Sequence, residues 1–295
     1  MGFRGVQGLG AAVVAAIVLL GLAGQAAAAT RVTTTPLEEP DFGDLVEIAG
    51  DGQAQDLVIH QGSVYNRFFV EEPGGIVDDS PDCVQDSPTR VRCDVSQIHF
   101  RITGGDGSDS IEIDQNLGYG RSVLQGGAGD DVINGGAFLT WMRGGSGDDT
   151  LVADSYTTSR TRGEGGNDLL IGADFGYGGP GADTIRTRGG HALGQGGADV
   201  LIGSDGGDDL IGGFGDDQLR ALAGDDELDG GSGSDLISAA AGNDIVHAED
   251  RGPEASIGCG HDFDFVFVDP AEKSATRGCE RRAVVHGDVQ QEPAS

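Results

Sequence analysis

Basic and aromatic residues are scarce in this sequence of 295 residues. It contains 18 Lys and Arg against 49 Asp and Glu, which gives a formal net charge of -31. An excess of acid on this scale repels nucleic acid and anionic membranes and attracts cations. Aromatic residues make up only 5% of the chain, which excludes a thick globular core. The composition therefore predicts a protein with no nucleic-acid partner and with cations as ligands.

Familiar catalytic motifs are missing as well. The sequence has no H-E-x-x-H motif and no G-x-S-x-G nucleophile elbow. Acidic pairs such as Asp130-Asp131 and Asp225-Asp226 could suggest glycosidase chemistry, but they fall at two fixed positions of the repeat described below. We therefore expect a protein that is not an enzyme. A small hydrolase within residues 30–103 is the alternative.

A long apolar run occurs once, from Leu9 to Ala23. It follows Arg4 and precedes a group of small residues that ends at Ala29. This pattern predicts a signal peptide over residues 1–29, so that the mature chain is secreted to the extracellular space and does not associate with a membrane. An uncleaved membrane anchor is the alternative, because the run approaches spanning length.

Glycine, in contrast, is abundant, with 54 residues. Much of it belongs to a nine-residue formula, G-G-x-G-x-D-x-U-x, in which U is a large aliphatic residue. Glycine at positions 1, 2 and 4 permits positive φ and close backbone approach. Each stretch therefore predicts a tight turn followed by a short strand. Six stretches fit the formula, and they begin at Gly104, Gly126, Gly144, Gly178, Gly212 and Gly230.

The spacing of the position-6 aspartates predicts how the repeats stack. From Gly194 to His247 the nonamers are contiguous, and upstream the intervals are close to two nonamers. Two nonamers therefore form one coil of turn, strand, turn and strand, with parallel strands about 4.8 Å apart. One turn column would carry Asp109, Asp131, Asp149, Asp168, Asp183, Asp199, Asp217 and Asp235. The opposite column would carry Asp208, Asp226 and Asp244.

These eleven aspartates are the predicted metal ligands. Carboxylate and carbonyl oxygens select Ca²⁺, and the site geometry disfavours Mg²⁺. With one ion between adjacent turns, fully occupied columns would hold on the order of nine ions. Ordering the backbone costs about 1–2 kcal/mol per residue, whereas one buried aliphatic residue in nine returns about 1.5–3 kcal/mol. We therefore expect folding to depend on calcium. The alternative is a calcium-free repeat whose aspartates only form turns.

Four cysteines flank the repeats: Cys83 with Cys93, and Cys259 with Cys279. An even number in an exported chain predicts disulfides. Of the three formal pairings, the local one is favoured because the repeats lie between the two pairs. A zinc site formed by Cys259, His261 and Cys279 is the alternative, although the C-x-H spacing lacks a standard second half.

The flanks are predicted to be caps, because the open strand edge of a solenoid invites aggregation. Residues 30–103 are rich in β-formers and predict an N-terminal β cap. Residues 250–295 predict a C-terminal cap with a polar tail.

The nonamers in residues 104–249 resemble the hemolysin-type (RTX) calcium-binding repeat. This resemblance implies an all-β protein built on a parallel β-roll, in which the matching aspartates and turn carbonyls ligate several calcium ions. The cysteine-bearing flanks look like those of secreted bacterial calcium-binding proteins of the same type. We therefore expect a structural, adhesive, surface or matrix component, which would contact a cell-surface or matrix polymer or self-associate. The alternative is a binding or targeting module associated with an extracellular hydrolase.

Overall fold

The computed structural model describes residues 30–36, 44–50, 56–61, 67–73, 76–78, 83–94, 98–114, 120–136, 139–153, 159–248, 256–268, 276–279 and 281–284. The predicted signal peptide and the end of the polar tail lie outside these residues. All elements in the described part are strands, as the all-β prediction requires. A search of the same residues found no helix that is long and apolar enough to cross a membrane.

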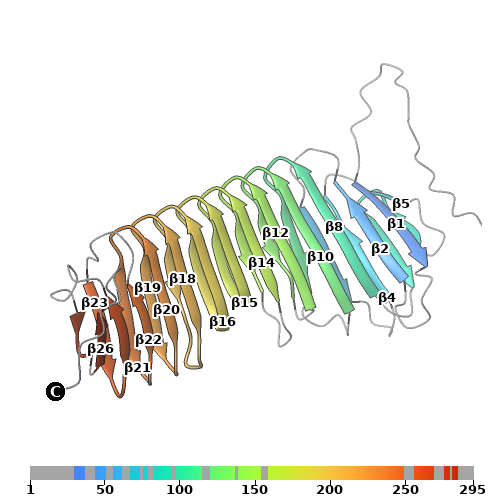
Figure 1. The fold of residues 1–295 in the computed structure, drawn as a ribbon. Helices are drawn as coiled ribbons and strands as arrows, with labels where there is room; N and C mark the ends of the chain where they lie inside the picture. The colour runs from blue at the N-terminus through green and yellow to red at the C-terminus, as the bar shows by residue number, and fades with distance from the viewer. Residues whose placement is uncertain are drawn as a thin grey trace, which may run out of the picture.

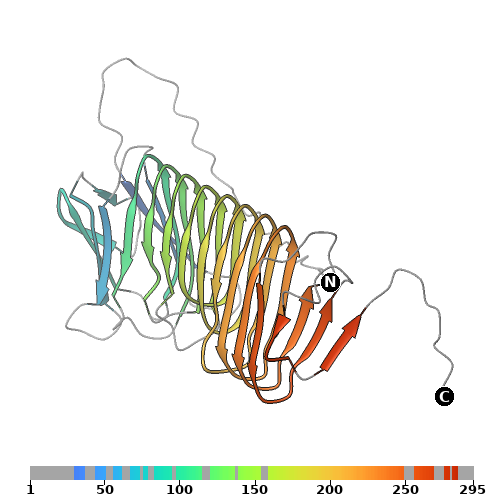
Figure 2. The same cartoon turned by 90° about the vertical axis from the view of Figure 1, so that its left-hand side faces the viewer.

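The strands form one hydrogen-bonded sheet that is folded into two layers, and the coils stack into an elongated roll (Figures 1 and 2). Layer 1 contains, in spatial order, β5 (Ile76–Asp78), β1 (Thr30–Pro36), β2 (Asp44–Ala49), β8 (Ile98–Asp106), β10 (Gly120–Ala128), β12 (Leu139–Ser146), β14 (Arg160–Gly165), the later parts of β15 (Leu169–Pro180) and β16 (Thr184–Gly196), β18 (Asp209–Phe214), β20 (Glu227–Ser232), β22 (Ile245–Ala248), β24 (Phe265–Val268) and β26 (Arg281–Val284).

Layer 2 runs alongside and is built from the alternate strands. It contains β6 (Cys83–Ser87), β7 (Arg90–Asp94), β4 (Arg67–Glu71), β3 (Asp56–Gln61), β9 (Ser110–Ile113), β11 (Val132–Asn134), β13 (Thr150–Val152), the earlier parts of β15 and β16, β17 (Val200–Ile202), β19 (Gln218–Ala223), β21 (Leu236–Ala241), β23 (Ser256–His261) and β25 (Thr276–Arg277). All pairings from β8 and β9 onward are parallel, so the predicted parallel β-roll is confirmed.

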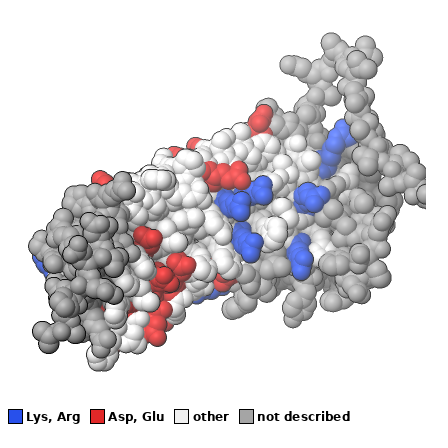
Figure 3. Space-filling model, viewed as in Figure 1, with Lys and Arg blue, Asp and Glu red and all other residues white. Residues whose placement is uncertain are grey.

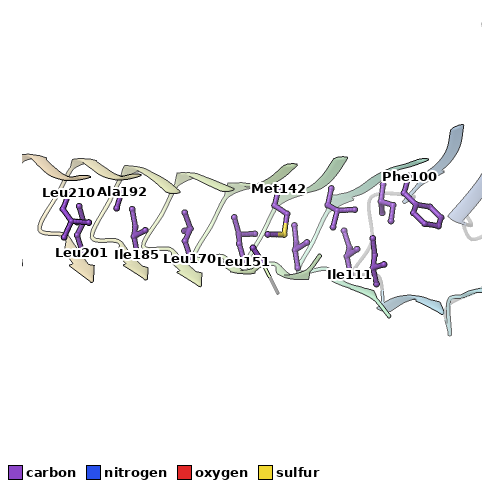
Figure 4. Close-up of a cluster of buried hydrophobic side chains, with 14 of the residues drawn as sticks. Phe100, Ile111, Met142, Leu151, Leu170, Ile185, Ala192, Leu201 and Leu210 are labelled. Atoms are coloured by element: carbon purple, nitrogen blue, oxygen red, sulfur yellow. The ribbon is translucent and has the colours of Figure 1, made fainter. Parts of the chain in front are cut away.

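The core is a thin row of side chains between the layers (Figure 4). Position 8 of each nonamer supplies one of them, and residues such as Leu151, Leu201 and Leu219 are completely buried. The row of core side chains is thinner in the middle of the roll, because layer 1 contributes only a glycine and an alanine there, Gly176 and Ala192. A Cβ on Gly176 would lie only 2.7 Å from Cγ2 of Ile185. The narrow core coincides with the two shortest coils, of 15 and 16 residues, and with register shifts between β15 and β16.

The N-terminal end of the roll is closed by antiparallel strands. β1 pairs with β2, β4 lies between β3 and β7, and β6 pairs with β7. Phe68 packs edge-on against Phe100 at 5.2 Å, which connects this end to the first parallel coil. A disulfide joins Cys83 to Cys93.

At the other end the parallel stack continues beyond residue 249. β23 pairs with β21, β24 pairs with β22, and β25 and β26 extend the two layers further. The residues expected to form a separate C-terminal cap therefore prolong the coils. Cys259 and Cys279 form a disulfide, so the alternative of a zinc site with His261 is wrong.

Candidate metal centre

The turns that join layer 1 to layer 2 share one backbone conformation. Positive φ occurs at positions 2 and 4 of the nonamer, as at Gly127 and Gly129. Position 1 meets only one of the two predicted needs for glycine, because it requires space for a close approach and does not adopt positive φ. A Cβ on Gly126 would collide with Oδ2 of Asp131, and position 1 of every turn in this column meets its own aspartate in the same way.

The first column contains all eight aspartates that the spacing predicts, each no more than 2% exposed. The backbone N–H of each aspartate donates to Oδ1 of the aspartate in the following coil, at 2.7–2.8 Å. These seven hydrogen bonds form an unbroken ladder from Asp109 to Asp235. The carboxylates are therefore held in line along one edge of the roll, across coils of 15 to 22 residues.

The second carboxylate oxygen is in a different situation. Within the described part of the chain, Oδ2 is buried and has no hydrogen-bond partner in eight aspartates: Asp131, Asp149, Asp168, Asp183, Asp199, Asp217, Asp226 and Asp244. A buried carboxylate oxygen without a donor is costly unless a cation or a proton compensates it. The repetition of this arrangement at a fixed position indicates a common ligand.

Backbone carbonyls converge on the same points. The space that a Cβ on Gly178 would occupy is bordered by Oδ2 of Asp183 and, at 2.8 Å from that Cβ, by the carbonyl oxygen of Gly194 in the next coil. Gly194 and Gly212 have equivalent surroundings. Carboxylate and carbonyl oxygens from two adjacent turns are the hard ligands that Ca²⁺ prefers. The residues present therefore fit calcium.

Burial also changes the acidity of these groups. It raises the pKa of Asp149 and Asp183 to about 7, and that of Asp217 and Asp244 to about 6. Repulsion from neighbouring aspartates adds to the rise, and the hydrogen bond from the preceding backbone N–H opposes it. Burial raises the pKa of Asp131, Asp168, Asp199 and Asp226 as well. A bound cation would remove the cause of these shifts by stabilising the charged form.

The second column lies on the opposite edge and has one more member than the sequence predicts. Asp208 donates its N–H to Asp226 at 2.8 Å, Asp226 to Asp244 at 3.0 Å, and Asp244 to Asp264 at 3.2 Å. Asp264 is completely buried. The formula conceals it, because Cys259 stands at position 1 and Asp262 at position 4. Asp262 still adopts the positive φ of that position, at 85°.

Asp208 differs from the other predicted ligands because protein donors satisfy both of its oxygens. Oδ1 accepts hydrogen bonds from the Thr187 hydroxyl at 2.8 Å and from the Gly190 N–H at 3.0 Å. Oδ2 accepts from the Ser204 N–H at 2.7 Å and from its hydroxyl at 3.1 Å. Asp208 therefore starts the second column as a fixed structural carboxylate.

Position 5 carries a second ladder that runs in the opposite direction. Asp130 accepts from the N–H of Asp148 in the following coil at 2.9 Å, and Asp148 accepts from that of Asn167 at 2.7 Å. These side chains are exposed, unlike their buried neighbours at position 6. The acidic pairs are thus explained by two roles: position 5 stabilises the turn from outside, and position 6 faces the candidate metal site.

No group of three or more His, Cys, Asp or Glu side chains that could hold a metal occurs within the described ranges. This agrees with sites in which two stacked carboxylates share the ion with carbonyls. The sequence prediction identified the first column completely. It missed Asp264, for which the G-x-D-x-D-x-V spacing from Gly260 to Val266 was the available signal.

Comparison with protein families matches residues 117–138, 141–155, 171–191, 192–219 and 211–246 to the RTX calcium-binding nonapeptide repeat (4 copies). No curated protein matches the chain. No solved structure matches it either. The matched segments contain the aspartates of both columns except Asp109, Asp168 and Asp264, and RTX nonapeptide repeats bind calcium. The chain therefore contains an array of hemolysin-type RTX calcium-binding nonapeptide repeats, and this array is folded as a β-roll.

Proposed function

We propose that this protein is a secreted, non-catalytic β-roll that folds or assembles with several calcium ions and serves as a structural, adhesive, surface or matrix component. The observation that carries the proposal is the line of buried Oδ2 atoms without hydrogen-bond partners in the described turns. Burial of so many carboxylates is unfavourable unless a cation compensates them. Calcium then contributes directly to the free energy of folding.

The two ladders support one site in each gap between neighbouring aspartates. The first column offers seven such gaps, and the second offers two, from Asp226 to Asp264, because protein donors already satisfy Asp208. Extracellular calcium modules bind at about 10⁻⁴–10⁻³ M, and free calcium at ten times Kd stabilises a fold by about 1.4 kcal/mol per site. Several such sites together are enough to decide whether a thin-cored roll folds.

Secretion is supported by two independent features. The N-terminal sequence reads as a signal peptide, and two disulfides close the ends of the roll. Disulfides persist in oxidising compartments outside the cytosol. In such compartments calcium is abundant, so the metal would promote folding only after export.

The test is a calcium titration of the purified protein followed by far-UV circular dichroism, with magnesium as the control ion. We expect a cooperative gain of β signal with calcium and none with magnesium at the same concentration, because Mg²⁺ demands near-ideal octahedral geometry and loses its water reluctantly. A complete β spectrum in excess chelator, at a pH above the raised pKa values of the aspartates, would contradict metal-coupled folding and would reduce the aspartates to turn formers.

A further inference from the structure

The outer surface of layer 1 changes character along the roll. Arginines occupy its N-terminal half, with Arg143 on β12 and Arg160 and Arg162 on β14, and all three are exposed. Acidic residues follow on β18 and β20. Figure 3 shows most basic side chains on one half of this face and most acidic side chains on the other, with one acidic patch beside the arginines. In a chain of net charge -31, a concentrated basic group indicates an anionic partner surface.

Strand register fixes the order of these side chains in two neighbouring rows. The first row contains Trp141, Arg160, Phe175, His191, Asp209 and Glu227. The second contains Arg143, Arg162, Tyr177, Leu193, Ile211 and Asp229. Successive members lie one strand apart, about 4.8 Å. Two pairs of a basic and an acidic member lie at matched distances on either side of β15 and β16: Arg160 with Asp209, and Arg143 with Asp229. The other matched places hold Trp141 with Glu227 and Arg162 with Ile211. Asp209 also contacts His191 at 2.6 Å within its own chain.

This order is self-complementary. A two-fold axis that lies in the surface, parallel to the strands and between β15 and β16, places β14 of one copy on β18 of another and β12 on β20. Arg160 then faces Asp209 in the first row, and Arg143 faces Asp229 in the second. We propose that this face is the contact surface between two copies of the chain, packed with their roll axes antiparallel.

The centre of the contact is aromatic. Phe175 and His191 stack at 5.2 Å with an interplanar angle of 13°, and the axis sets this pair against the same pair of the second copy. Arg160 lies over the Phe175 ring at 5.2 Å, next to the centre. Beyond the charged strands, the same axis sets Ile245, which is 41% exposed, against Val123 of the second copy. An aromatic centre with charges around it has the anatomy of a specific interface.

Charge also selects the direction of packing. A two-fold axis along the roll would set β14 on β14 and β20 on β20, which would bring like charges together. Juxtaposed like charges cost several kcal/mol, so only the antiparallel arrangement is favourable. The strands from β8 to β24 span roughly 43 Å at about 4.8 Å each, and the surface is two rows wide. A strip of this length and width is narrower than a standard interface, which buries about 800 Å² per partner, so we expect a reversible, salt-sensitive dimer.

The inference goes beyond the calcium-coupled folding proposed above and needs only that the roll is folded. The test is sedimentation of the purified protein in saturating calcium at low and high salt, with R143E, D229R and the double variant. Each single variant replaces two attractive contacts with two repulsive ones across the two-fold axis. We expect each to weaken dimerisation about tenfold or more, and the double variant to restore it. R220E, on the outer surface of layer 2, is the matched control and should dimerise normally.

Arg143 also contacts Glu164 at 3.9 Å within its own chain, so D229R supplies an independent disruption. A protein that stays monomeric at all concentrations, or a double variant that is not rescued, would overturn the proposal. Retention on an immobilised polyanion that is lost in R143E but unchanged in D229R, without dimers, would assign the basic group to an anionic polymer and would also overturn it. Circular dichroism in calcium checks folding separately, so failure of metal-coupled folding is distinguished from failure to dimerise.

Discussion

At the scale of single residues, the repeat assigns opposite tasks to adjacent aspartates. Asp217 is 1% exposed and accepts the N–H of Asp199 through Oδ1, while its Oδ2 has no partner among the described residues. Asp216 is exposed and accepts the N–H of Ser234 at 2.9 Å. Only the buried member of the pair can face a shared metal site, so chemically identical neighbours should respond differently to mutation.

We therefore predict that Asp217→Ala raises the calcium midpoint of folding by roughly tenfold, which corresponds to about 1.4 kcal/mol. Asp216→Ala is the matched control and should shift the midpoint much less, because it removes one solvent-exposed hydrogen bond and no metal ligand. Calcium titrations followed by circular dichroism measure both. Equal shifts would contradict the assignment of position 6 as the metal-facing position.

At the scale of the turn and its strand, the start of the second column is an exception to the repeat. Asp208 receives four hydrogen bonds from Thr187, Gly190 and Ser204, whereas Oδ2 of Asp226 has no partner in the described part of the chain. Aspartate at position 6 of the nonamer is thus a structural carboxylate at Asp208 and a carboxylate available to a cation at Asp226.

Asp208→Asn and Asp226→Asn should separate these roles. We predict that Asp226→Asn lowers the number of bound calcium ions, because it removes the charge of an open carboxylate. Asp208→Asn should leave the number unchanged and instead destabilise the roll by about 1–3 kcal/mol, since one of its carboxylate acceptors becomes a donor facing donors. Calorimetric titration counts the ions, and denaturant unfolding in calcium measures stability. Loss of an ion in Asp208→Asn would show that this carboxylate is a ligand.

The sequence predicts those features of the turns and strands that are determined within one nonamer, and it does not predict those that depend on contacts between coils. The nine-residue period predicts the parallel coils and the eight aspartates of the first column, because turn and strand lie within one nonamer. It could not predict the partners of Asp208, since Thr187 and Gly190 come from the preceding coil, which does not fit the formula. Asp264 was missed because its own nonamer departs from the formula at positions 1 and 4. Only the backbone shows that Asp262, at φ 85°, takes the place of a glycine.

The surface of layer 1 is a further feature that the period does not predict. Trp141 and Arg160 are 19 residues apart and share no motif, yet they become neighbours through the register of β12 and β14. The guanidinium of Arg160 lies 5.8 Å from the centre of the Trp141 ring. The residues at outward-facing strand positions can be charged or uncharged, because neither the core nor the turns depend on them.

At the scale of the whole molecule, acidity couples to calcium. Carboxyls whose pKa is raised from 3.8 to about 6 or 7 hold protons in the metal-free folded state that the unfolded chain has already released. Their contribution to stability is therefore fully present below about pH 4 and is lost as the pH rises through these raised values. Calcium must displace the same protons, so the apparent affinity for calcium rises as the pH rises through these pKa values.

We therefore predict that the metal-free roll, measured by circular dichroism in chelator, loses β signal as the pH rises from about 4 to about 8. The calcium midpoint should fall in parallel, and calcium added at about pH 6 to a weakly buffered sample should release protons. Sodium chloride at equal ionic strength is the control, because screening alone should release few protons. A calcium midpoint that stays the same from about pH 5.5 to about pH 8 would contradict the prediction.

The two counter-running ladders also have a mechanical consequence. The position-5 ladder joins successive coils from Ser108 to Ala182 and resumes at Asp216. Between them Ala182 and Ala198 have no side-chain acceptor to continue it, and the core is thinnest nearby, at Gly176 and Ala192. Of the two ladders, only the buried position-6 ladder continues across this joint between the two segments of the position-5 ladder, through Asp183 and Asp199, so we expect tension along the roll to extend it there first. The proposed two-fold axis crosses the same place, so a second copy would pack over the joint and stiffen it.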